Sequence, residues 1–187
     1  VAERTLKDVD VILWLVEPTT FIGAGERHIA EQLKGLHLPV ILVINKVDTV
    51  DKDEKTMNAI EKEIRAQFVY LDYAPIAFTS ALTHSKVNKL IPLIDEVHDS
   101  CCMRIMTNVL NDVILDAQMM NPPKPHLGKQ LKIYYASQVS VEPPTIVLFV
   151  NDPELLHFSY SRYIENKLRE AFGFVGTPIR IIARKKS

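Results

Sequence analysis

Cysteines and long apolar runs are scarce in this sequence. Only two of its 187 residues are cysteines, Cys101 and Cys102, and they are adjacent. Adjacent cysteines are poorly placed for a disulfide bond and lack the spacing of a zinc site, so we expect a reducing cytoplasm and no metal site made by these thiols. No apolar run is long enough to cross a membrane and no signal peptide begins the chain, so we expect no membrane partner.

An excess of charge of one sign is also lacking overall, since the net charge is −1 at pH 7. The apolar fraction of 47% and the charged fraction of 24% are those of a globular protein. The two halves nevertheless differ. Residues 1–100 carry 11 Lys and Arg against 16 Asp and Glu, whereas residues 101–187 carry 11 against 7. This asymmetry is either a chance distribution over two solvated surfaces or a sign that the second half faces an anionic partner such as RNA.

The most informative stretch is the apolar run from Val40 to Ile44 with the polar residues behind it. The run follows a proline, is too short for a helix and is too apolar for a half-exposed strand, so it predicts a buried parallel strand. It ends in Asn45-Lys46-Val47-Asp48. In open α/β sheets, ligands bind at the carboxyl ends of the strands.

The side chains of this tetrapeptide suit a guanine base. Asp48 would accept hydrogen bonds from the ring N–H and the exocyclic amine, a donor pair that adenine does not present. Asn45 would brace the loop and the N7/O6 edge, and the stem of Lys46 would lie along the purine face. A solvated turn after a strand is the alternative interpretation.

A second apolar run, over residues 75–79, is followed by Ser80-Ala81-Leu82. The two motifs together resemble the NKxD and SA[LK] pair of the translation-factor class of GTPases. The resemblance implies that GTP or GDP is bound and that Ser80, Ala81 and Leu82 present backbone N–H groups to the guanine O6. It also argues against the interpretation in which Asn45–Asp48 are only a turn.

Glycine is too scarce for the phosphate-binding part of such a site. The six glycines include no G-x-x-x-x-G-K-[ST] loop, no D-x-x-G motif is present, and only nine residues precede Asp10. We therefore expect a fragment with the base-reading half of a G domain, in which Mg²⁺ is bound only in the complete protein. By itself the chain is predicted to bind guanine nucleotides weakly and not to hydrolyse GTP.

Apolar periodicity predicts an α/β fold in two parts. In residues 1–100 we expect the C-terminal half of a Ras-like GTPase domain, a parallel sheet without its first strands. Its strands are predicted over 10–16, 40–44 and 75–79, and its helices over 26–36, 53–68 and 86–99. Residues 101–187 are predicted to form an α-β-β-α-β domain with elements over 107–119, 131–139, 145–150, 159–172 and 177–184, the first helix being capped by Thr107 or Asn108.

From about Val50 to the end the chain resembles the Der (EngA) family of bacterial GTPases, through residues 71–76, 107–112, 149–155 and 170–180. Members of this family act in the assembly of the large ribosomal subunit, so the resemblance implies a ribosomal RNA partner and a KH-like second domain. Residues 11–26 are more similar to the Era family, whose members also end in a KH domain.

The RNA-binding loop of a KH domain is not expected in the KH-like half. KH domains clamp nucleic-acid backbone with a G-x-x-G loop between two helices. The loop after the second predicted strand instead reads Asn151-Asp152-Pro153-Glu154, whose carboxylates repel phosphate. We therefore expect RNA binding to be weak and indifferent to sequence. Tyr134 and Tyr135 are predicted to point to opposite sheet faces, with packing favoured over base stacking.

Three functional hypotheses follow. The favoured one is a fragment of a ribosome-assembly GTPase. The second is a nucleotide-independent RNA- or protein-binding module built on the KH-like half, and the third is an unrelated α/β domain. Because no partner strand is predicted for the outer edge of the strand over 10–16, we also expect self-association through this edge.

Overall fold

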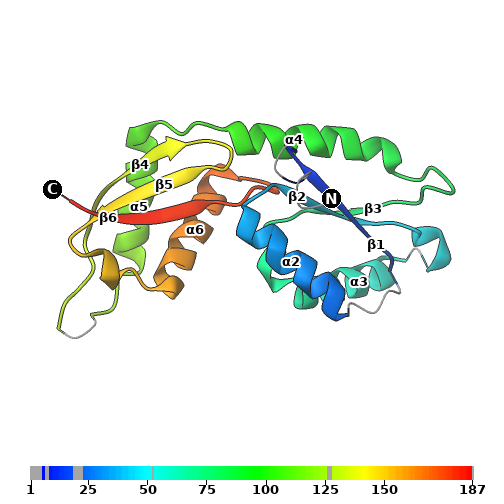
Figure 1. Cartoon of the computed structure of the whole chain (residues 1–187), viewed down its shortest axis with the longest axis horizontal. Helices are drawn as coiled ribbons and strands as arrows, with labels where there is room; N and C mark the ends of the chain where they lie inside the picture. The colour runs from blue at the N-terminus through cyan, green and yellow to red at the C-terminus, as the bar shows by residue number, and fades with distance from the viewer. Residues whose placement is uncertain (1–5, 7–8, 19–22, 52, 126–127, 187) are drawn as a thin grey trace. The chain divides into compact units, whose positions relative to one another are not determined.

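The computed structural model describes residues 6, 9–18, 23–51, 53–125 and 128–186 (Figure 1). The chain divides into two compact units. Unit 1 comprises Val1–Ser100 and Val175–Pro178, and unit 2 comprises Cys101–Phe174 and Ile179–Ser187. Among the described residues, no helix is long and apolar enough to span a membrane.

Unit 1 is built on a parallel sheet of strands in the order β1-β2-β3. The strands are β1 (Ile12–Val16), β2 (Val40–Ile44) and β3 (Ile76–Phe78). The helices are α2 (Ala24–Leu36), α3 (Glu54–Gln67) and α4 (Leu90–Cys102). The predicted α/β architecture with a parallel sheet is confirmed.

Both faces of this sheet are covered, each by its own hydrophobic core, and the strand β2 between them is therefore buried along its whole length. On one face Val40, Leu42 and Ile44 pack in a cluster with residues of α2 and α3. On the other face Ile41 and Val43 pack against α4. Figure 1 shows α2 and α3 on one side of the sheet and α4 on the other.

Strand β1, predicted over residues 10–16, is covered on only one of its faces. Trp14 packs on Phe68, with ring centroids 4.7 Å apart. The alternate residues Leu13 and Leu15 are 37% and 59% exposed. Among the described strands β1 pairs only with β2, so the β1 edge away from β2 has no strand partner in the described part of the chain.

Two helix starts show how local chemistry sets an element's boundary. Helix α3 begins after Asp53, whose Oδ1 accepts a hydrogen bond from the Thr56 N–H at 2.8 Å. This bond lowers the pKa of Asp53. Helix α4 begins at Leu90 rather than at residue 86, which leaves Pro92 in the first turn, where a helix tolerates proline.

Unit 2 has the predicted α-β-β-α-β order, which is confirmed. Its elements are α5 (Thr107–Met120), β4 (Ile133–Ser140), β5 (Thr145–Val150), α6 (Phe158–Phe172) and β6 (Arg180–Lys185). In the sheet order β4-β5-β6, β5 is antiparallel to β4 and parallel to β6. Both helices pack on one face of this sheet, around Leu110, Ile114, Ile146, Leu148, Ile164 and Leu168.

Two details of unit 2 differ from prediction. The residue before α5 is Met106, which makes no capping hydrogen bond through its side chain, so neither Thr107 nor Asn108 is the N-cap. Tyr134 and Tyr135 do not point to opposite faces, since the Lys186 amine lies 4.8 Å and 6.0 Å from their ring centroids. The reason is a register irregularity between Ile133 and Tyr135, because a bulge breaks the alternation of side chains along a strand.

The outer edge of β4 is covered by side-chain amides of α5. Asn111 donates to the Ala136 carbonyl at 2.9 Å and accepts from the Ala136 N–H at 2.7 Å. Three residues earlier in β4, the Gln118 side chain donates to the Ile133 carbonyl at 3.3 Å and accepts from the Ile133 N–H at 3.2 Å. The two amides take the place of a neighbouring strand, so this edge is closed to further strands.

The segment between α6 and β6 returns to unit 1. Val40 N–H donates to the Gly176 carbonyl at 3.0 Å, and Gly176 N–H donates to the Tyr73 carbonyl at 3.1 Å. At φ +65° a Cβ on Gly176 would lie 2.5 Å from a methyl carbon of Val97, so only glycine fits. Residues 173–176 have the sequence G-x-x-G. This segment joins α6 to β6, so it is not the loop between two helices with which KH domains clamp nucleic-acid backbone.

Candidate guanine-recognition site

The first part of the site is the turn that follows β2. Lys46 has a left-handed backbone (φ 63°) and precedes the 3-10 turn Val47–Thr49. The Thr49 hydroxyl and N–H both donate to the Lys46 carbonyl, at 2.7 Å and 3.1 Å. The buried side chain of Val47 holds the turn against the core. The polar side chains on either side of Val47 therefore project from a fixed loop at the end of a buried strand.

Asn45 connects this turn to the second predicted motif. Its Oδ1 accepts a hydrogen bond from the Ala81 N–H at 3.0 Å and another from the Thr79 hydroxyl at 3.3 Å. Its own N–H donates to the Val16 carbonyl at 2.9 Å. The amide oxygen thus braces the segment after β3, and the backbone N–H ties the turn to the end of β1. This leaves the NH₂ end of the Asn45 side chain as the group to face a base.

Asp48 lies next to the second motif. Its Oδ1 accepts a hydrogen bond from the Ser80 hydroxyl, and the Ser80 oxygen accepts one from the Thr83 N–H at 3.2 Å. Ser80 is fully buried, so its hydroxyl holds the Asp48 carboxylate in a fixed orientation from the interior side of the loop. Because a carboxylate has about four acceptor positions, one bond to Ser80 does not exhaust its capacity.

The loop after β3 is closed by a bridge between Ser80 and Ser85, with Ser80 N–H donating to the Ser85 carbonyl at 3.1 Å. The Ala81 N–H is occupied by Asn45, as described above. Leu82 is exposed at the loop tip and is the motif residue whose N–H takes part in none of these bonds. Leu82 is thus the motif residue best placed to donate to a base oxygen.

Sequence reasoning missed Glu17, the first residue after β1. Its carboxylate forms an ion pair with the Lys46 amine, and both side chains are about half exposed. An ion pair at such exposure stabilises the fold little, but it does fix the direction of the Lys46 stem. The sequence could have indicated Glu17 as a site residue, because it directly follows an apolar strand, as Asn45 does after β2.

The site brings together the predicted residues from two loops far apart in sequence. Asn45 and Asp48 contact Ala81 and Ser80, respectively, while Lys46 and Leu82 lie at the exposed rim. A carboxylate, an amide and a backbone N–H are presented at one edge of a parallel sheet. This set of acceptors and donors complements the edge of a purine that carries both a ring N–H and an amine.

The two units match two family models. Residues 2–100 match the elongation factor Tu GTP binding domain. Residues 104–184 match the KH-domain-like of EngA bacterial GTPase enzymes, C-terminal.

Curated relatives match almost the whole chain. Over 185 residues it is 55% identical to GTPase Der of Bacillus cereus (strain ATCC 10987 / NRS 248), a match that covers 99% of this chain and 42% of the relative. The same identity and coverage hold for GTPase Der of Bacillus thuringiensis (strain Al Hakam). The chain therefore spans less than half the length of these relatives, and the match includes its first fifty residues.

Among solved structures, the chain is similar to Aquifex aeolicus Era bound to GDP and AlF₄⁻. The TM-score is 0.45 at 20% sequence identity, and the alignment covers 99% of this chain and 68% of the Era chain. An Era complex with MgGDPNP and a segment of 16S ribosomal RNA gives a TM-score of 0.44 at 19% identity, with the same coverage.

Proposed function

This chain belongs to the family of the elongation factor Tu GTP-binding domain, in the branch of GTPase Der (EngA), and on this premise we propose that unit 1 reads the guanine base of GTP or GDP. The observation that carries the proposal is the hydrogen-bonded link between the two motifs, Asn45 with Ala81 and Asp48 with Ser80. A solvated turn would not require both motifs to be held together.

Each residue of the site has a distinct part in the proposal. Asp48 accepts from the ring N–H and the exocyclic amine of guanine, and Ser80 keeps its carboxylate in position. Asn45 faces the N7/O6 edge with its NH₂ group, and Leu82 N–H donates to O6. The stem of Lys46, held by Glu17, lies along the purine face.

The Mg²⁺ ion that the family implies does not fit the carboxylates of this site. Glu17 is paired with Lys46, and Asp48 is bonded to Ser80 and is needed for the base. We therefore propose that Mg²⁺ and the phosphates are held by other parts of the complete protein, which would hydrolyse GTP. In the same proposal the complete protein is cytoplasmic and acts in assembly of the large ribosomal subunit, as the Der resemblance implies.

Base recognition is tested on the chain itself by saturation-transfer NMR with guanosine, inosine and adenosine at millimolar concentration. The charged bonds of Asp48 contribute about 1.5–3 kcal/mol, so binding at about millimolar strength or weaker is expected. Guanosine should give the strongest transfer, inosine less because it lacks the amine, and adenosine the least. Equal transfer from all three nucleosides would overturn the proposal.

The variant Asp48→Asn sharpens the same experiment. Its side-chain NH₂ would donate to O2 of xanthosine, at the position where guanosine carries its amine, so the preference should change from guanosine to xanthosine. Asp51→Asn, in the same loop region but outside the motif, is the matched control and should keep the guanosine preference. If Asp48→Asn still prefers guanosine, Asp48 does not read the base.

A second candidate function, RNA or protein binding by unit 2 without nucleotide, is favoured by the basic excess of residues 101–187. The loop Asn151–Glu154 gives no support to a KH-type clamp there. Asn151 uses its side chain to bond the backbone of Lys132 and Gln130, at 2.8 Å and 2.9 Å, and Asp152 accepts from the Glu154 N–H at 3.1 Å. We therefore place any RNA contact of unit 2 elsewhere on its surface.

A further inference from the structure

The sheet face of unit 2 opposite α5 and α6 carries a row of aromatic and basic side chains. Tyr135 is paired with Phe149 across β4 and β5, and Phe149 is paired with Arg184 across β5 and β6. The Tyr135 and Phe149 rings are stacked, with centroids 4.3 Å apart and an interplanar angle of 15°. Residues paired in register point to the same face, so the row crosses all three strands.

A second aromatic ring and a second cation extend this row. The bulge in β4 places Tyr134 beside Tyr135, and the Lys186 amine lies 4.8 Å from the Tyr134 ring centroid. The two tyrosines are 50% and 42% exposed, and Arg184 and Lys186 are exposed as well. We call Tyr134, Tyr135, Phe149, Arg184 and Lys186 the aromatic–basic row.

The rest of this face adds positive charge and no negative charge. The strand register places its other positions at Ser137, Thr145, Val147, Arg180 and Ile182. Arg180 is exposed, Ser137 and Ile182 are partly exposed, and Thr145 and Val147 are buried, so the open part of this face is its aromatic–basic row and Arg180. None of these positions is a carboxylate. Half-exposed aromatic rings among cations complement a ligand with flat apolar surfaces joined by anionic groups.

We propose that the aromatic–basic row binds single-stranded RNA. Bases stack on the exposed rings of Tyr134 and Tyr135, and Arg184 and Lys186 contact the phosphates on either side. Open sheets that carry aromatic rings bind single strands in this way, because every base has a stacking face and the backbone follows the positive charge. The proposal rests on the RNA contact of unit 2 proposed above and gives it a location and a chemistry.

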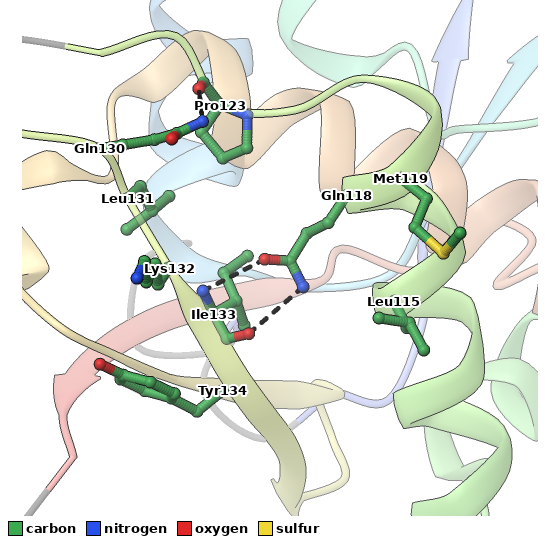
Figure 2. Close-up of a pocket in the computed structure, with 9 residues that line it drawn as sticks. All are labelled: Leu115, Gln118, Met119, Pro123, Gln130, Leu131, Lys132, Ile133 and Tyr134. Carbon is green, nitrogen blue, oxygen red and sulfur yellow. Dashed lines mark hydrogen bonds between the residues drawn. The ribbon is translucent and has the colours of Figure 1, made fainter.

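The structure favours RNA over an added peptide strand at this place. A groove of about 370 Å³ lies between α5 and the start of β4, and Tyr134 forms one of its walls (Figure 2). Figure 2 shows the Gln118 amide on the backbone of Ile133 within this groove. A peptide would need those backbone groups to extend the sheet. A base beside Tyr134 would need only the apolar surface of Leu115 and Met119, which are both exposed.

The test is fluorescence anisotropy of the full chain with a labelled single-stranded RNA and with an abasic strand of the same length and charge. The chain should bind the RNA more tightly than the abasic strand. Tyr134→Ala and Tyr135→Ala should each weaken RNA binding by about 5- to 100-fold and leave the abasic strand and the salt slope unchanged. Lys186→Ala should lower the salt slope by about 0.7.

Matched controls separate the row from general effects on the surface. Phe158→Ala removes another exposed aromatic ring of unit 2, which is 73% exposed at the start of α6, and should change RNA affinity less than about twofold. Tyr135→Phe should bind RNA as the unmodified chain does, because stacking needs the ring and not the hydroxyl. Unchanged circular dichroism spectra and melting temperatures check that each variant is folded.

The outcomes distinguish this inference from the function it rests on. If RNA is bound but the tyrosine variants bind it equally well, or the abasic strand binds as tightly, the stacking site is wrong and an RNA contact elsewhere on unit 2 remains. If the unmodified chain binds no RNA at low salt, the RNA contact of unit 2 is itself overturned.

Discussion

The two sheets differ in how their outer edges are finished. In unit 2, Asn111 and Gln118 of α5 bond both backbone groups of Ala136 and Ile133, so the edge of β4 is closed by its own unit. In unit 1, β1 has no described strand on its outer side, and its residues Leu13 and Leu15 are exposed. Unit 2 thus completes its sheet edge with side chains, whereas in the described part of unit 1 no strand covers the outer edge of β1.

The units also differ in which parts of the chain they need. Unit 1 includes Val175–Pro178, which lie beyond α6 in the sequence, and Val40 at the start of β2 donates to Gly176. The Thr177 hydroxyl donates to the carbonyl of Val97 at 3.2 Å. Unit 1 therefore depends on four residues from the far end of the chain, and this dependence can be tested.

The largest effect is expected for Gly176→Val, which should destabilise unit 1 by about 3 kcal/mol because the new side chain meets Val97 and the backbone has positive φ. Urea unfolding followed by fluorescence of Trp14, the one tryptophan of the chain, reports on unit 1. Hydrogen exchange in β5 reports on unit 2 and should change less. Gly35→Ala is the control, since its Cβ meets nothing within 4 Å. Equal loss of stability in both units would contradict the comparison.

A smaller loss is expected for Asn111→Ala, which leaves both backbone groups of Ala136 without the bonds from α5. We expect unit 2 to lose about 2 kcal/mol of unfolding free energy and the β4 edge to become able to pair between molecules. Thermal unfolding and sedimentation velocity measure the two effects. Asn108→Ala, at an exposed position of the same helix, should change neither, and a variant of Asn111 that stays stable and monomeric would show that the amide is not needed.

Changes at the edge of unit 1 should alter association rather than stability. We expect the unmodified chain to self-associate through β1, and Leu15→Lys should shift it toward monomer by placing a charge on the exposed face. The free energy of unfolding should change by less than about 0.5 kcal/mol, because Leu15 is mostly exposed. Sedimentation velocity over a range of concentrations decides this. A monodisperse monomer for the unmodified chain at high concentration would falsify the expectation.

The smallest effects concern pH, and they have opposite signs in the two units. In unit 1 the Thr56 N–H bond lowers the pKa of Asp53 below 3.8, so its stabilisation is present above that value and is lost as pH falls through the folded pKa. In unit 2 burial raises the pKa of Tyr160 to about 12 from 10.0. The contribution of Tyr160 to the unfolding free energy is therefore fully present below pH 10 and is lost as pH rises toward 12.

These pH effects are measured as unfolding free energies of Asp53→Asn and Tyr160→Phe relative to the unmodified chain. Asp53→Asn should flatten the acid side of the profile seen by Trp14, and Tyr160→Phe should flatten the alkaline side seen by hydrogen exchange in unit 2. Profiles parallel to that of the unmodified chain would show that neither group has the stated linkage.

Much of the fold followed from local patterns. The strand over residues 145–150 was predicted with the bounds that the structure has, because its apolar run is short and is flanked by polar and turn residues. The helix predicted over 159–172 begins one residue later than the observed α6, and Gly173 ends that helix. The hydrogen bonds between the residues of the site were harder to predict from the sequence. The motif spacing indicated that Asn45 and Asp48 share a sheet edge with Ser80, but it could not indicate that Ala81 N–H is used by Asn45.

By itself the sequence determined the order and type of the elements and the carboxyl strand ends where the polar motifs lie, because these depend on hydrophobic periodicity and turn chemistry within about ten residues. Only the tertiary structure decided the pairing of Glu17 with Lys46, the return of Gly176 to unit 1, and the amide bonds of Asn111. It also decided that Tyr134 and Tyr135 lie near one lysine. These features depend on strand register and on contacts between distant segments, which no local pattern specifies.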